Sequence, residues 1–194
     1  RPYRCFNAVA TPSSSQMATS RRLHAWEMRA ARTVFAEAID YRRVRVHEGA
    51  VWANMLDDWA RRLRAMGPRP VQQHNAIALG FHCFFPVSLP LPAEQSSGMS
   101  YISVAWLLHE LVHVWQFQRM GWRYLLLALA AHLREGANVY DFGGEAGLLR
   151  CRRQGWKLQS FNMEQQAAIV QSAYHHACAG QPDSVWLDYL ADVR

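Results

Sequence analysis

The sequence has no long apolar run and no block of like charge. Its apolar stretch at 125–131 is far shorter than the roughly 18 residues that a membrane-crossing helix needs, so we expect no membrane span. The 21 Lys and Arg residues outnumber the 15 Asp and Glu residues, which gives a formal charge of +6. The arginines are scattered, and no nucleic-acid-binding motif accompanies them. We therefore expect no nucleic-acid partner, although a basic nucleic-acid-binding domain remains a weak alternative.

Cysteine is scarce, and its spacing excludes one class of metal site. The four cysteines are widely spaced: Cys5, Cys83, Cys151 and Cys178. Because no C-x-x-C pair is present, we expect no structural zinc site built on cysteines. We interpret them as buried free thiols. A disulfide between Cys151 and Cys178 is the alternative in an oxidising compartment.

The sequence also lacks internal repeats and low-complexity domains, and its 194 residues suffice for one compact domain. Residues 1–19 predict a flexible arm, and residues 20–194 predict a single domain. Its helix-rich pattern, with a few short strands, predicts an α+β fold with a small β-sheet. Helices are expected at 21–39 with Ser20 as N-cap, and at 52–66, 101–118, 122–133, 162–179 and 184–192. Strands are expected at 41–47, 76–79 and 81–85, and a turn-rich connection at 136–147.

Residues 107–116 read LLHELVHVWQ and contain the pattern H-E-x-x-H. Residues four apart lie on one helix face, so His109 and His113 can offer two imidazoles to one metal ion, with Glu110 beside them. Imidazole suits zinc, and three protein ligands leave a fourth position for water. Zinc lowers the pKa of such a water to about 7, and Glu110 can accept its proton and pass it to a leaving amine. We therefore predict a catalytic Zn²⁺ site. The motif also favours a zincin-like metallopeptidase fold, with the small β-sheet beside the metal-binding helix.

The third ligand separates the subclasses of this motif. The metzincin extension fails, because position 116 is Gln instead of Gly and position 119 is Arg instead of His. Glu164 is the favoured third ligand, because it begins an amphipathic helix among small and polar residues that permit close packing. Acidic residues in the connection before that helix remain alternatives: Glu135, Asp141 and Glu145.

Enzymes with this motif usually add a Tyr or His that stabilises the oxyanion of the tetrahedral intermediate. Tyr140, between the two ligand-bearing helices, and Tyr174, deep in the last long helix, are the candidates. His175 falls on nearly the same face as Glu164 but about 16 Å further along the axis, so it cannot easily share the metal. The remaining histidines have no partner pattern and are interpreted as structural or exposed: His24, His47, His74, His82 and His132.

Three blocks of the sequence carry a resemblance to a known family. The first comprises 27–35, 39–41 and 44–47, the second is LLHELVHVWQ at 107–116, and the third comprises Tyr140-Asp141 and FNMEQQA at 161–167. Together they span most of the domain and resemble zinc metallopeptidases related to the C-terminal extensions of VgrG spike proteins of type VI secretion systems. The Trp-rich segment at 52–66 departs from the pattern of that family.

The resemblance implies a gluzincin-like site with His109, His113 and Glu164 as ligands and Glu110 as the base. It also implies an antibacterial effector that a contractile secretion machine delivers and that acts in the periplasm of the attacked cell. The implied partners are a protein or peptide substrate, a VgrG-type spike protein as carrier and a cognate immunity protein. A rival hypothesis is a non-catalytic, zinc-stabilised binding module at a spike tip.

Overall fold

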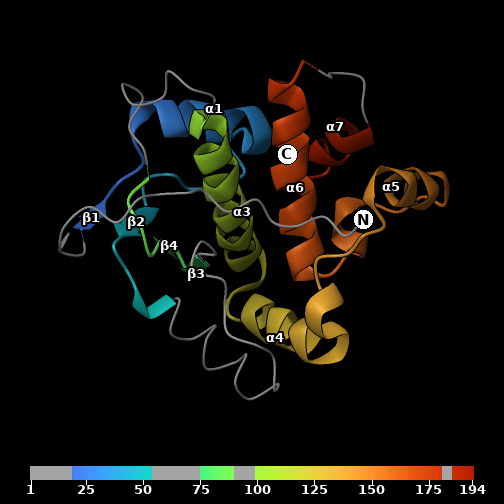
Figure 1. The fold of residues 1–194 in the computed structure, drawn as a ribbon, viewed down its shortest axis with the longest axis horizontal. Coiled ribbons are helices and arrows are strands. Elements are labelled where there is room, and N and C mark those ends of the chain that lie inside the picture. The colour runs from blue at the N-terminus through green and yellow to red at the C-terminus, as the bar shows by residue number, and fades with distance from the viewer. Residues whose placement is uncertain (1–18, 54–74, 90–98, 181–184) are drawn as a thin grey trace.

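The structure, a computed structural model, describes residues 19–53, 75–89, 99–180 and 185–194. Within these residues a small sheet lies on one side of a long central helix, and further helices lie on the other side (Figure 1). The fold is therefore helix-rich α+β, as the sequence predicts. No helix in the described ranges is both long and apolar enough to cross a membrane. The expected arm at 1–19 and the expected helix at 52–66 lie almost entirely outside these ranges.

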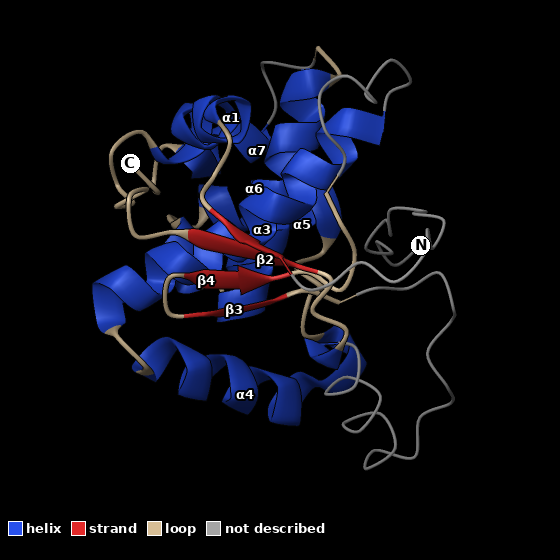
Figure 2. Cartoon of the chain, turned by 90° about the vertical axis from the view of Figure 1, so that its left-hand side faces the viewer, coloured by secondary structure: helices blue, strands red, loops and turns tan. Residues whose placement is uncertain are grey.

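The sheet has four short strands in the order β1-β2-β4-β3, of which β2, β4 and β3 are labelled in Figure 2. They are β1 (Thr19–Arg21), β2 (Arg45–Glu48), β3 (Ile77–Leu79) and β4 (His82–Phe84). The central strands β2 and β4 run parallel, whereas β1 and β3 pair antiparallel with their neighbours. Val46 pairs with Cys83, and both side chains are fully buried, so their face of the sheet packs into the core.

Helix α3 (Met99–Met120) is the centre of the fold. Strands β3 and β4 contact it on one side, and α6 (Met163–Cys178) contacts it on the other. All ten residues from 107 to 116 are buried. A helix that is covered on both sides needs apolar residues all round, which explains the near-continuous apolar sequence of this segment. The few polar residues within it must find their partners inside the protein.

The remaining helices surround this core. They are α1 (Ala25–Phe35), α4 (Arg123–Glu135), α5 (Gly144–Arg153) and α7 (Val185–Leu190), with the 3-10 turns η2 (Gly136–Asn138) and η3 (Leu158–Ser160). Gly121 ends α3 in a left-handed conformation with φ 62°, and α4 begins two residues later. The helices predicted at 101–118, 122–133, 162–179 and 184–192 are thereby confirmed, as are the strands at 76–79 and 81–85.

The start of α6 is set by a reciprocal cap. The Asn162 side chain accepts a hydrogen bond from the Gln165 amide at 2.8 Å, and the Gln165 side chain accepts one from the Asn162 amide at 3.2 Å. The Asn162 amide nitrogen Nδ2 also donates to Val139 and Glu135. This cap places Glu164 in the first turn of α6, on a helix start that is tied to the end of α4.

The predicted N-cap Ser20 is wrong. Ser20 lies in strand β1 opposite His47, and α1 begins after His24. Arg21 explains the difference, because its guanidinium pairs with Glu27 at 2.7 Å and with Glu48 at 2.6 Å. Glu27 is fully buried and also accepts the His24 amide at 2.8 Å. The chain before α1 is thus held as a strand by an ion-pair network with a residue on β2.

Two further predictions need correction. The predicted strand at 41–47 begins only at Arg45, because Tyr41 lies in a turn where its hydroxyl donates to the Ala36 carbonyl at 2.7 Å. The turn-rich connection at 136–147 already includes the first turn of α5. The three described cysteines are free, so the alternative disulfide between Cys151 and Cys178 is not formed. Cys83 is buried as expected, but Cys178 is exposed and Cys151 is half-buried.

Candidate metal centre

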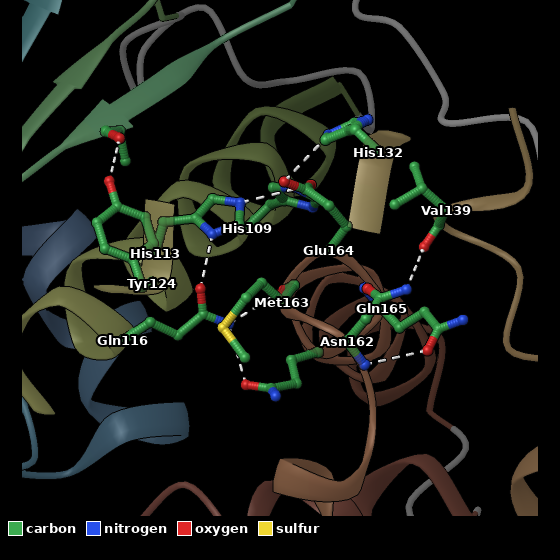
Figure 3. Close-up of polar contacts among 12 residues, drawn as sticks. His109, His113, Gln116, Tyr124, His132, Val139, Asn162, Met163, Glu164 and Gln165 are labelled. Carbon is green, nitrogen blue, oxygen red and sulfur yellow. Dashed lines mark hydrogen bonds and ion pairs between the residues drawn. The ribbon is translucent and has the colours of Figure 1, made fainter. Parts of the chain in front are cut away.

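Three side chains from two helices converge in the core. His109 and His113 come from α3, and Glu164 comes from the first turn of α6 (Figure 3). Their ligand atoms all lie within 4.8 Å of one another, and all three residues are buried. The Glu164 carboxylate oxygen Oε2 is 3.7 Å from His109 Nε2 and 3.6 Å from His113 Nε2. The group could hold a metal ion, and its members are the three ligands that the sequence favours.

The second ring nitrogen of each histidine is held by an amide. His109 Nδ1 lies 3.1 Å from the Gln171 side-chain oxygen, and His113 Nδ1 lies 2.9 Å from the Gln116 side-chain oxygen. An amide oxygen can only accept, so each Nδ1 carries the proton and each Nε2 keeps its lone pair for a metal. Sequence reasoning missed both glutamines as supports of the ligands.

Gln116 is itself anchored. Its amide nitrogen donates to the Met163 carbonyl and to the Gln166 side chain, both at 3.0 Å, and it is fully buried. It thus joins His113 on α3 to the start of α6, beside Glu164. Gln116 stands where the metzincin pattern has glycine. In this structure its side chain orients His113 and connects α3 to α6.

His132 on α4 is a further residue of the centre that sequence reasoning missed. Its Nε2 lies 3.4 Å from the other oxygen of Glu164, Oε1, and the contact is visible in Figure 3. One carboxylate oxygen therefore faces the two ligand histidines, and the other faces His132. No local signal in the sequence could have shown this contact, because it depends on how α4 packs against α6.

Glu110 is buried beside the ligand group without a hydrogen-bond partner for one oxygen. It is 3% exposed, and no described residue donates to its Oε2. Burial raises the pKa of its carboxyl group, His109 and His113 act to lower it, and Glu164 acts to raise it further. A buried carboxylate oxygen without a partner costs free energy unless a ligand or water satisfies it. Such an oxygen next to two imidazoles and a carboxylate fits a site built around a metal and its water.

The electrostatics of the ligand group reflect its tight packing. Burial lowers the pKa of His113, but the charge and hydrogen bond of Glu164 outweigh it and raise the pKa to about 9. Burial acts to raise the pKa of Glu164, but the three surrounding histidines hold it well below its usual range. In the metal-free protein a proton on His113 therefore takes the place of a cation beside Glu164.

Tyr140 lies beside the centre, whereas Tyr174 does not belong to it. The ring centroid of Tyr140 is 6.3 Å from that of His109 and 5.9 Å from that of His132. Tyr174 packs against the hydrophobic core further along α6, near Cys178. Of the two tyrosines considered from the sequence, Tyr140 is the one placed next to His109 and His132.

The other acidic candidates have different partners. Glu135 accepts hydrogen bonds from Asn162 and Arg134, and Asp141 accepts one from the Gly143 amide at 2.8 Å. Glu145 is exposed at the start of α5. None of the three belongs to the converging group of described residues. Two histidines interpreted as structural or exposed, His47 and His82, lie on the sheet with their ring nitrogens 2.8 Å apart.

The geometry thus combines two imidazoles whose Nε2 atoms face the Glu164 carboxylate with a second, unsatisfied carboxylate in a buried cluster. Comparison of the chain with family models, with curated proteins and with solved structures finds no match. Any assignment of a chemical activity therefore depends on the residues of this centre.

Proposed function

We propose that this chain is a zinc-dependent metallopeptidase of the gluzincin type. The observation that carries the proposal is the buried group His109, His113 and Glu164 with the unsatisfied Glu110 carboxylate beside it. Two histidines and one glutamate are a ligand set of catalytic zinc sites, and three protein ligands leave a coordination position open. The same donor types also serve non-haem iron(II), but the H-E-x-x-H spacing on one helix favours zinc.

Each polar residue of the centre has a distinct role in this proposal. A zinc ion held by the three ligands would polarise the scissile carbonyl and lower the pKa of the attacking water to about 7. Glu110 accepts the proton of that water at its free oxygen Oε2 and then donates it to the leaving amine. Burial raises the Glu110 pKa, which makes the carboxylate a stronger base and its acid form an available donor. Tyr140 is the proposed donor to the oxyanion.

The sheet supplies a place for an extended substrate. Strand β3 is an edge strand of the sheet and contacts α3, the helix that carries both histidines. An edge strand presents unpaired backbone groups with which an extended peptide can pair. The Ala78 carbonyl of β3 already accepts the Tyr124 hydroxyl, so a peptide would pair with the remaining groups of this edge. We therefore propose a peptide or protein as the substrate class.

The biological setting rests on the sequence resemblance alone. We propose a toxin domain that a contractile secretion system delivers with a VgrG-type spike and that acts in the periplasm of the target bacterium. An immunity protein in the producing cell would accompany such a toxin. The positive formal charge and the composition neither require nor oppose this setting.

Replacement of Glu110 tests the proposed mechanism. The Glu110→Gln variant keeps the size of the side chain and leaves the three ligands in place, so zinc content by elemental analysis should stay unchanged. Cleavage of a quenched fluorescent peptide library should fall by about 100- to 10,000-fold, because the general base is lost. Glu145→Gln, which changes an exposed glutamate on α5, is the matched control and should cleave normally.

Unchanged cleavage by the Glu110→Gln protein would refute its role as the base. Full zinc occupancy in the native protein, together with no cleavage of any peptide and no toxicity in the periplasm of a target cell, would favour the non-catalytic binding module instead. Iron in place of zinc in the purified protein would refute the assignment of the metal.

A further inference from the structure

Helix α4 carries an apolar face that no described residue covers. Of the nine large hydrophobic residues that are exposed in the described part of the chain, six lie between 122 and 133: Trp122, Leu125, Leu126, Leu127, Leu129 and Leu133. Leu126 is 67% and Leu133 is 73% exposed, which exceeds the exposure of every other leucine in the described ranges. Isolated exposed leucines are ordinary, but such a concentration on one helix marks an interaction surface.

Four of these side chains form one stripe. At about 100° per residue, positions 122, 126, 129 and 133 fall within about 60° of one another on the helix surface. The buried residues Tyr124, Ala128 and Ala131 lie on the opposite side and attach α4 to the core. Figure 2 shows α4 along the lower border of the molecule, beneath β3 and at the opposite end from α1. The stripe, defined here as Trp122, Leu126, Leu129 and Leu133, therefore faces outward from a preformed helix.

The charges beside the stripe are positive. Arg123 and Arg134 are exposed and lie about 90° around the helix from the centre of the stripe. The first turn of α4 contains no acidic residue, and the only acid of the helix, Glu135, pairs with Arg134 at 2.5 Å, so Arg123 is the charge that no acid of α4 offsets. Long basic side chains at this angle can extend to anionic headgroups while the leucines enter the acyl layer. Trp122 at one end of the stripe also suits a membrane–water interface.

The same charges disfavour a second copy of the chain as the occupant. If two α4 helices packed antiparallel along their stripes, Arg123 of one copy would approach Arg134 of the other. The one acid of α4, Glu135, is already paired with Arg134 of its own helix, so Arg123 of each copy would meet no free carboxylate of α4. Like charges at an interface weaken association, whereas an anionic lipid surface is complementary to the same arginines. The helix is also too short to span a bilayer, so it can only lie in the interface.

We propose that α4 docks the protein on anionic phospholipid membranes, with the stripe inserted and Arg123 and Arg134 at the headgroups. The helix is held to the rest of the fold by the hydrogen bond from Tyr124 to the Ala78 carbonyl and by His132 beside Glu164. Docking therefore costs little ordering of the helix. Because His132 belongs to the metal centre, docking also brings that centre close to the membrane surface.

Flotation of the purified protein with lipid vesicles tests the proposal. The native protein should float with vesicles of equimolar phosphatidylcholine and phosphatidylglycerol and should not float with phosphatidylcholine alone. The double variant Leu126→Glu/Leu133→Glu should bind the anionic vesicles at least about 100-fold more weakly, because two leucines that would insert into the membrane are lost and two charges of the same sign as the lipid are gained. Arg123→Ala should weaken binding about fivefold. Leu149→Glu on α5, 40% exposed, is the matched control and should bind normally.

Equal flotation with both vesicle types, no flotation of the native protein, or equal loss in the Leu149→Glu control would overturn the proposal. A dimer in light scattering that the double variant abolishes, without vesicle binding, would show that a second copy covers the stripe. Circular dichroism of each variant checks that the fold is retained. Vesicle binding needs no enzymatic activity, so failure of this proposal and failure of the proposed peptidase function are distinguishable.

Discussion

His132 offers the sharpest test of how the metal centre is built. Its Nε2 lies 3.4 Å from Oε1 of Glu164, while Oε2 of the same carboxylate faces His109 and His113. By holding Oε1, His132 would restrict Glu164 to one oxygen as a ligand of a bound metal ion, which would leave a coordination position open. The substitution His132→Leu removes this contact but no member of the ligand group.

The expected loss of zinc affinity follows from the geometry. Residues that orient a metal ligand typically contribute a factor of 10–100 to metal affinity. The His132 side chain is 27% exposed, and its contact with Glu164 is long for a hydrogen bond, so the lower end of that range applies. We expect His132→Leu to bind zinc about tenfold more weakly, which corresponds to about 1.4 kcal/mol.

Competition with a chromophoric zinc chelator measures this difference. The cobalt(II)-substituted protein adds a readout that a merely structural role would not change. In His132→Leu the released Glu164 can bind through both oxygens, so the visible absorbance should weaken as the coordination number rises. His82→Leu, at an exposed histidine of β4, is the control and should match the native protein in both measurements. Native zinc affinity and an unchanged cobalt spectrum in His132→Leu would refute the reasoning.

Two further predictions concern the support and the titration of the centre. Gln116→Ala should lower the free energy of unfolding by about 2–4 kcal/mol in chemical denaturation, because His113, Met163 and Gln166 each lose a buried partner. A decrease smaller than about 0.5 kcal/mol would contradict the role of Gln116 in joining α3 to α6. In the metal-free protein the His113 pKa is raised to about 9, so its contribution to stability is complete below about pH 6.5 and is lost as the pH rises through 9. Thermal unfolding of the chelator-treated protein should therefore show falling stability between these values while zinc affinity rises, and Glu164→Gln should flatten the stability trend. Rising stability of the metal-free native protein over the same interval would refute the coupling.

The helical periodicity of the sequence was sufficient to predict that His109 and His113 lie together. His113 follows His109 by four positions on one helix, and no tertiary contact is needed to bring them to one face. The predicted helix at 101–118 extends only two residues further at each end in the structure. The start of α6 was also readable, because Asn162 and Gln165 form a cap from residues three apart in the sequence.

The first turn of α5 lies within the turn-rich connection predicted at 136–147, because the glycines there have two different structural origins. Gly143 and Gly144 adopt positive φ values, as a turn requires. Gly147 has another origin, since a Cβ atom there would lie 2.3 Å from the Phe142 carbonyl oxygen. It is a helical residue that the close approach of the preceding loop restricts to glycine. Sequence cannot distinguish a glycine needed for its backbone angle from one needed for space.

Only the tertiary structure decided which residues complete the centre. Glu164 follows His113 by 51 positions along the chain, and its place beside the two histidines depends on the packing of α6 against α3. The contact of His132 with Glu164 depends in the same way on the packing of α4 against α6. Spacing on one helix specifies directions only within that helix. The choice among Glu135, Asp141, Glu145 and Glu164, and the support from His132, required the relative positions of three helices.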